Sequence, residues 1–239
     1  AKAVMEMFGK ENVQIAIGPQ IADGFYYDFE LPRALTEDDF KTIEDKMREI
    51  MLRKEDWTRL VVSKKEALEM FKDQKFKIEL INDLPEDETI TVYKTGDDFM
   101  DLCSGPHIEN SQELLGVAYK VKSVSGAYWR GDEKREVLQR VYVYAFPDKK
   151  QLKEHLNLIK EAQERDHKKL GPQLGLFMFH PSAPGMPYWL PNGWKLFNAL
   201  LTYWRSVHER HGYQEISGPV LSNKILWETS GHWGHYKEN

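Results

Sequence analysis

The 239-residue sequence contains a single cysteine, Cys103. One cysteine cannot form an internal disulfide, which excludes the disulfide-stabilised class of small secreted domains and favours a reducing, cytoplasmic environment. No apolar run approaches the ~18 residues needed to cross a bilayer, so no membrane segment is expected. Basic residues are not in excess either. The formal net charge of −5 argues against wholesale nucleic-acid binding and leaves local basic patches possible.

What the sequence does contain is typical of a folded globular protein, with 41% apolar and 30% charged residues. Its length predicts two structural units, and there is no internal repeat or low-complexity tract. The first residue is Ala1, with no targeting signature after it, and the final letters HYKEN form no recognisable end signal. We therefore expect an internal piece of a longer protein.

Hydrophobic periodicity predicts a mixed α+β fold. Capping boxes at Thr36/Asp39 and Ser63/Glu66 begin two of the expected helices. Helices are expected at 1–8, 36–53, 63–71, a segment ending within 79–85, 148–171 and 192–211. Strands are expected at 13–19, 25–29, 59–62, 89–94, 99–103, 117–131, 137–146 and 213–221.

Three details of these elements have structural consequences. Asp23-Gly24 predicts a hairpin turn, after which alternate residues of the strand face opposite sides. Asn192 is expected to cap the 192–211 helix, and Gly171-Pro172 to end the helix before it. The 213–221 strand ends at Gly218-Pro219, which suits a sheet edge or an interface because proline lacks a backbone donor.

The stretch DLCSGPH, residues 101–107, has three interpretations. Cys103 and His107 supply two metal-ligand types, but zinc normally takes at least three protein ligands. They also supply a nucleophile and a base, although a Gly-Pro turn separates them and leaves the distance between sulfur and nitrogen open. The third interpretation is a turn with a buried thiol, since free cysteine is often buried. Asp101 adds a carboxylate to the cluster and makes it a candidate functional site.

A run of motifs then resembles the threonyl-tRNA synthetase family in order and spacing. The motifs are IAIGP, DGFYYDF, DLCSGPH, SGAYWRGD, LQRVY and ERDHKKLG, followed by GPV and LWETSGHW. The resemblance implies three parts: residues 1–146 as an editing domain of mixed helices and antiparallel sheet, 147–170 as a linker helix, and 171–239 as the start of a class II antiparallel-sheet catalytic domain.

The resemblance also implies an activity. It is the ATP-dependent attachment of threonine to tRNA(Thr) in the full-length protein, with hydrolysis of mischarged seryl-tRNA by the editing domain. Partners and cofactors implied are threonine, ATP, Mg²⁺, a catalytic zinc and a second copy of the chain in a homodimer. No ATP motif and no metal ligand is assigned within these residues. The alternative is a non-catalytic tRNA-binding or trans-editing module with a degenerate pocket.

The family's editing pocket maps onto this chain residue by residue. Asp101, Cys103 and His107 match its Asp-x-Cys-x-x-x-His motif, and Lys77 matches its central lysine. Lys2 stands where alignment through AVMEMF places a family histidine, so either the pocket uses it as a fixed positive charge or editing is weakened. We expect His107 and Lys77 to position or polarise a water and Asp101 to recognise serine, with Cys103 a wall residue.

Four further assignments concern RNA and the partner subunit. Tyr128 and Arg130 are expected to contact the tRNA end, while Trp129 next to them is expected to plug the loop. Pro219 is expected at the dimer interface, by resemblance to the first class II motif. His232 and His235 are expected to be exposed or at an interface rather than metal ligands. The tryptophans at 189, 194, 204 and 227 are expected in core and dimer surface.

Overall fold

The computed structural model describes residues 1–86 and 88–236, in which two compact units meet at Lys160/Glu161. Both units combine helices with antiparallel sheets, which confirms the mixed α+β class. The boundary falls inside the helix expected as a linker. In the described residues no helix is both long enough and apolar enough to span a membrane.

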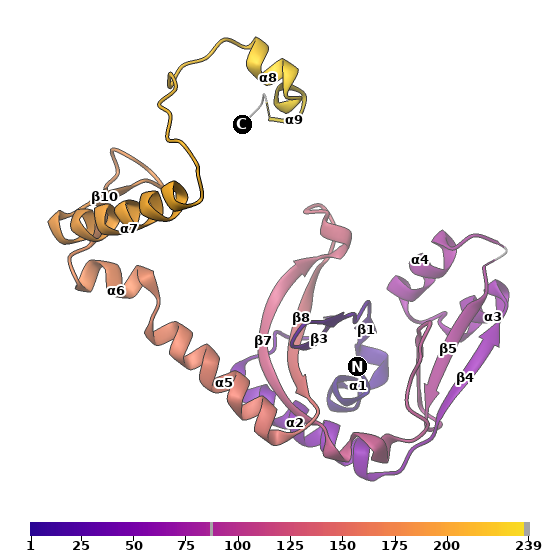
Figure 1. The fold of residues 1–239 in the computed structure, drawn as a ribbon. Coiled ribbons are helices and arrows are strands. Elements are labelled where there is room, and N and C mark those ends of the chain that lie inside the picture. Colours follow the sequence, from indigo (N-terminus) through magenta and orange to yellow (C-terminus); the bar gives the residue numbers. More distant parts are fainter. Residues whose placement is uncertain (87, 237–239) are drawn as a thin grey trace. The chain divides into compact units, whose positions relative to one another are not determined.

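The first unit, Ala1–Lys160, contains two sheets with helices around them (Figure 1). Its strands are β1 (Gln14–Ile15), β2 (Gln20–Ile21), β3 (Gly24–Glu30), β4 (Trp57–Val62), β5 (Ile90–Thr95), β6 (Phe99–Leu102), β7 (Ala118–Tyr128) and β8 (Val137–Phe146). Its helices are α1 (Lys2–Phe8), α2 (Glu37–Leu52), α3 (Lys64–Met70), α4 (Lys75–Asp83) and α5 (Lys149–Glu164), with short 3₁₀ turns at Lys10–Asn12, Ser111–Gly116 and Trp129–Gly131.

The larger sheet has the order β1-β3-β8-β7, with β2 also paired to β3. The expected Asp23-Gly24 turn is confirmed, since Ile21 pairs with Gly24 across it. Inward residues of β3, Phe25, Tyr27 and Phe29, pack into the core with α1 and α2, as the alternation predicted. This core builds one wall of the cavity described below.

The smaller sheet has the order β4-β5-β6, all antiparallel. Its core includes Ala67 and Phe71 at α3, Ile81 of α4 and Val92 of β5. The predicted Ser63/Glu66 capping box is confirmed at the start of α3, with both reciprocal bonds formed. In Figure 1 α1 lies between the two sheets, so residues from both sheets face a common interior.

The second unit, Glu161–Asn239, consists of short elements and one long helix. They are α6 (His167–Gln173), β9 (Phe177–Phe179), β10 (Pro187–Trp189), α7 (Pro191–Arg210), α8 (Ile225–Thr229) and α9 (His232–Tyr236). β9 and β10 form an antiparallel pair, and α7 ends just before Gly212, as predicted.

Three expectations in this part of the chain were wrong. The 148–171 helix is interrupted, because Asp166 adopts a non-helical backbone and accepts from the Lys168 N–H to start α6, which contains Gly171-Pro172. The N-cap of helix α7 is Leu190 rather than Asn192, two residues earlier than expected, and Pro191 occupies the first turn, where a missing N–H costs nothing. Residues 213–221 form no strand, because none of the described residues provides them with a pairing partner.

Candidate functional site

A cavity of about 710 Å³ opens in the first unit between its two sheets. Helices α1, α2 and α4 contribute to its walls together with β3, β5 and β6. All five residues that the sequence singled out for the editing pocket line it: Lys2, Lys77, Asp101, Cys103 and His107. The structure therefore brings together positions that are far apart in the sequence.

The DLCSGPH stretch leaves the sheet at the end of β6. Asp101 pairs with Tyr93 of β5, and the ladder continues past β6 because the Cys103 N–H donates to the Thr91 carbonyl at 3.2 Å. The Thr91 hydroxyl also donates to the Cys103 carbonyl at 2.5 Å. The backbone of residues 101–103 is thus held against β5 both within β6 and one residue beyond its end.

Gly105 makes the turn that follows. Its φ of 71° lies in the left-handed region, and a Cβ there would lie 2.1 Å from the Tyr93 hydroxyl. Only glycine fits this position, and the peptide bond to Pro106 is cis. The turn returns the chain toward β5, so that His107 contacts the Tyr93 ring.

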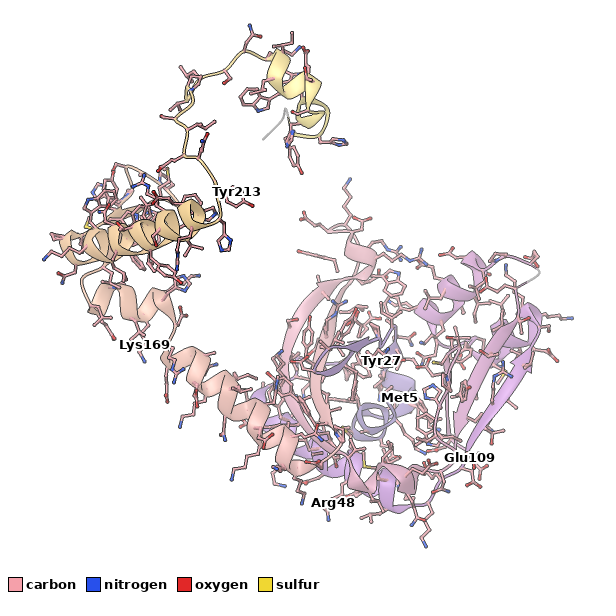
Figure 2. All side chains as sticks on the ribbon, in the orientation of Figure 1. Met5, Tyr27, Arg48, Glu109, Lys169 and Tyr213 are labelled. Carbon is pink, nitrogen blue, oxygen red and sulfur yellow. The ribbon has the colours of Figure 1, made fainter. Side chains whose placement is uncertain are left out.

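Asp101 is the centre of a buried polar network. Its carboxylate lies 2.5 Å from the Lys77 ammonium, and it accepts a hydrogen bond from the Tyr27 hydroxyl and one from the Leu102 N–H at 2.8 Å. The Lys77 side chain is only 3% exposed, so this carboxylate takes the place of solvent around its ammonium. Burial, and then the negative charge of Asp101, raise the pKa of Tyr27 well above its ordinary value. Tyr27, labelled in the interior in Figure 2, therefore stays a neutral donor.

His107 is held by two aromatic rings. Its ring centre lies 4.9 Å from that of Trp57 and 4.4 Å from that of Tyr93, the latter in an edge-on arrangement. His107 is exposed to solvent on one side, but its partial burial against the two rings lowers its pKa below the ordinary value, and the negative charge of Asp101 only partly opposes this. At neutral pH the imidazole is therefore uncharged and able to accept a proton.

The remaining two lining residues have different surroundings. Cys103 is a free, partly exposed thiol whose sulfur accepts a long hydrogen bond from the Gly105 N–H at 3.4 Å. Lys2 is 6% exposed, and its ammonium is shared between the carboxylates of Glu55 and Asp98 and the Thr95 carbonyl. It joins α1 to the start of β4 and to the β5–β6 turn, so its position is fixed by ion pairing.

The residues expected to contact RNA lie at the far end of β7. Tyr128 is 46% exposed, whereas Trp129 is 2% exposed and packs on Phe76, as a loop plug would. The Arg130 guanidinium is paired with the carboxylates of Glu79 and Asp83. Any RNA contact by Arg130 has to compete with these two carboxylates.

Residues expected at a dimer surface lie in the second unit. Pro219 belongs to the irregular segment 213–221, and its neighbour Val220 is 97% exposed. The tryptophans at 189, 194, 204 and 227 are each at least 40% exposed, so they form no core within this unit. His232 and His235 are exposed as well. In the described residues no group of three or more His, Cys, Asp and Glu is placed to hold a metal ion.

Sequence reasoning missed three residues of this site: Tyr27, Trp57 and Tyr93. The inward face of β3 was predicted, but no pattern indicated that the Tyr27 hydroxyl would meet Asp101, 74 positions away. The two aromatic contacts of His107 likewise join separate strands. Aromatic residues in predicted strands were the available signal, and they did not show which ones would meet His107.

Comparison with known proteins identifies the class of this unit. Residues 90–142, which include Asp101, Cys103 and His107, match the family described as "Threonyl and Alanyl tRNA synthetase second additional domain". The cavity residues Asp101, Cys103 and His107 thus lie in the segment that resembles this additional domain.

Whole-chain relatives narrow the class further. The chain is 52% identical over 241 residues to a protein of Petrotoga mobilis named "Threonine--tRNA ligase" and 47% identical over 241 residues to one of the same name from Clostridioides difficile. It is also 47% identical to "Threonine--tRNA ligase 2" of Bacillus subtilis. Each match covers 100% of this chain and 37% of the relative. The resemblance to threonyl-tRNA synthetases is confirmed: the chain is homologous, along its whole length, to part of these ligases.

Proposed function

We propose that the cavity of the first unit hydrolyses the ester bond of mischarged seryl-tRNA. The observation that supports this most strongly is the combination, in one cavity, of an uncharged imidazole with a fixed Lys77–Asp101 ion pair. Ester hydrolysis needs a group that takes a proton from water and a positive group that stabilises the developing oxyanion. His107 and Lys77 supply these two functions.

In the proposed reaction, His107 accepts a proton as the water oxygen bonds to the ester carbonyl carbon. The bond between that carbon and the ribose oxygen then breaks, the ribose oxygen takes up the proton held by His107, and free serine and tRNA result. The Lys77 ammonium stabilises the carbonyl oxygen, and Lys2 adds a fixed positive charge to the wall. Asp101, already oriented by Tyr27 and Lys77, recognises the amino group or hydroxyl of serine. Cys103 is a wall residue with no covalent role.

A hydrolytic site of this kind is needed because serine and threonine are hard to distinguish by binding alone. Serine lacks one methyl group of threonine, and a difference of that size supports discrimination of only about 1–3 kcal/mol in a single binding step. A second, hydrolytic site corrects the resulting errors. The polar groups in the wall of the cavity, Asp101 among them, would recognise serine there.

For the whole protein we propose the ATP-dependent attachment of threonine to tRNA(Thr) in the cytoplasm. Residues 1–146 would be the editing domain, 147–170 the linker helix and 171–239 part of the class II catalytic domain. A homodimer would form around Pro219, and Tyr128 and Arg130 would contact the tRNA end. The ATP, Mg²⁺ and zinc that this activity would use are assigned to no residue of this chain.

The test is hydrolysis of purified seryl-tRNA by the full chain and by His107→Ala. We expect release of serine by the first and a loss of about 100-fold or more in the second, the scale typical of removing a general base. Cys103→Ala is the matched control, because it alters the same turn and leaves the proposed proton acceptor in place. Equal rates for the first two proteins would contradict the proposal, and tRNA binding without hydrolysis would favour a non-catalytic tRNA-binding module.

A further inference from the structure

Trp57 is the one large residue in contact with His107 that comes from β4, at the opposite edge of its sheet from the His107 turn. The indole lines the cavity with His107, and the two ring centres lie 4.9 Å apart with a 40° tilt. The other ring contact of His107 is the edge of Tyr93, from β5. The imidazole is therefore held between rings from two neighbouring strands.

The backbone of Trp57 is tied to the same loop. Its N–H donates to the carbonyl of Glu109, labelled in Figure 2, at 2.8 Å. The next pairs continue this connection, with Asp56 bridged to Asn110 and the Ser111 N–H donating to the Glu55 carbonyl at 2.9 Å. The loop after His107 is thus hydrogen-bonded to the backbone of Trp57, whose ring contacts His107. These bonds hold the indole at a fixed distance from that loop.

The indole nitrogen of Trp57 indicates independently that this residue does more than fill space. Nε1 is buried and has no hydrogen-bond partner among the described residues. A buried donor without a partner lowers stability, and a phenylalanine would fill space without that cost. Packing alone therefore does not account for a tryptophan here. Its larger ring offers more contact area to the imidazole than phenylalanine can.

We infer that Trp57 is a positioning residue, whose indole ring holds the His107 imidazole in the orientation that the proposed hydrolysis requires. The inference rests on the proposed function. Hydrolysis depends on the direction of one ring nitrogen, and a misplacement of about 1 Å can cost about 100-fold in rate. The neighbouring groups cannot replace the indole, since Asp101 is bonded to Lys77 and Tyr27, and Tyr93 contacts His107 through a ring edge.

The experiment compares Trp57→Phe and Trp57→Leu in the full chain. Phenylalanine keeps an aromatic ring but offers the imidazole less contact area, so hydrolysis of seryl-tRNA should fall about threefold, less than with leucine. Leucine keeps apolar volume without a ring, so kcat should fall about tenfold with KM nearly unchanged. Phe71→Leu is the control, because it removes a buried ring from the core between α3 and β5 without touching His107.

The second readout is the set of NOE cross-peaks between the imidazole protons of His107, assigned by their absence in His107→Ala, and the ring protons of Tyr93. Trp57→Leu should weaken or remove these cross-peaks, and Phe71→Leu should leave them in place. A Trp57→Leu protein with unchanged kcat, or with unchanged cross-peaks, would overturn the inference. If the unmodified chain does not hydrolyse seryl-tRNA, the proposed catalysis fails, and the cross-peaks still decide whether Trp57 positions His107.

Discussion

At the scale of single residues, the site depends on the protonation states of a few groups. Asp101 and Lys77 form an ion pair in the cavity wall, Tyr27 is kept protonated, and partial burial favours the unprotonated form of His107. Groups suited to hydrolysis thus line a largely apolar cavity. Each of these states has a measurable consequence.

Removing one partner of the Lys77–Asp101 pair should destabilise the protein more than removing both. Asp101→Asn leaves a buried ammonium without its carboxylate, and the free energy of unfolding should fall by about 3 kcal/mol in urea titrations. Adding Lys77→Met removes the stranded charge, so the double variant should recover most of the loss. A single variant as stable as the unmodified protein would show that the pair is not as buried as the 3% exposure of Lys77 indicates.

His107 predicts the pH dependence of hydrolysis. Because burial lowers its pKa, the imidazole accepts protons throughout the neutral range. The rate should be constant from about pH 7 to 8 and fall on acidification, with a midpoint below the ordinary value of about 6.5. The unfolded chain takes up this proton first, so acidification through the same range should also lower the free energy of unfolding. A rate midpoint above 6.5 would contradict the assignment.

At the scale of helices and strands, local signals determined most of the first unit. Capping boxes, the Asp23-Gly24 turn and alternating apolar residues predicted α2, α3, β3 and β8. The site was only half predictable for a physical reason: motifs mark residues close in sequence, such as Asp101 and His107. Partners such as Tyr27 and Trp57 are selected by strand pairing over long sequence separations.

Asp39 gives a prediction for helix α2. Its carboxylate accepts hydrogen bonds from the Thr36 N–H at 2.9 Å and from both terminal guanidinium nitrogens of Arg33. These hydrogen bonds, of which those from Arg33 have the largest effect, hold the pKa of Asp39 well below its ordinary value. Asp39→Ala should lower the free energy of unfolding by about 1 kcal/mol at pH 7. Since the folded pKa is the lower one, the difference should shrink as pH falls below about 4, and a constant difference would contradict this.

At the scale of the whole molecule, the second unit leaves large apolar side chains uncovered. They include Leu200 and Tyr203 on α7, and Ile216, Val220 and Leu221 in the irregular segment, each at least 61% exposed. A strand expected at 213–221 has no partner within the described residues, which is why a local pattern failed there. Strand propensity takes effect only when a ladder is available.

This exposure predicts self-association. In sedimentation equilibrium the chain should show an average mass above that of a monomer, rising with concentration, because uncovered apolar surface of this extent favours contacts. Val220→Asp should reduce the association, whereas a charge at Val61, exposed on β4 of the first unit, should not. A clean monomer at all concentrations would contradict the proposed interface around Pro219.

Selective removal of serine from tRNA by the first unit is tested most directly by the rates at which the full chain hydrolyses seryl-tRNA and threonyl-tRNA at pH 7.5. We expect hydrolysis of seryl-tRNA well above the spontaneous rate, slower hydrolysis of threonyl-tRNA, and loss of the difference in His107→Ala. Spontaneous rates for both substrates with the unmodified chain would contradict the proposed editing activity.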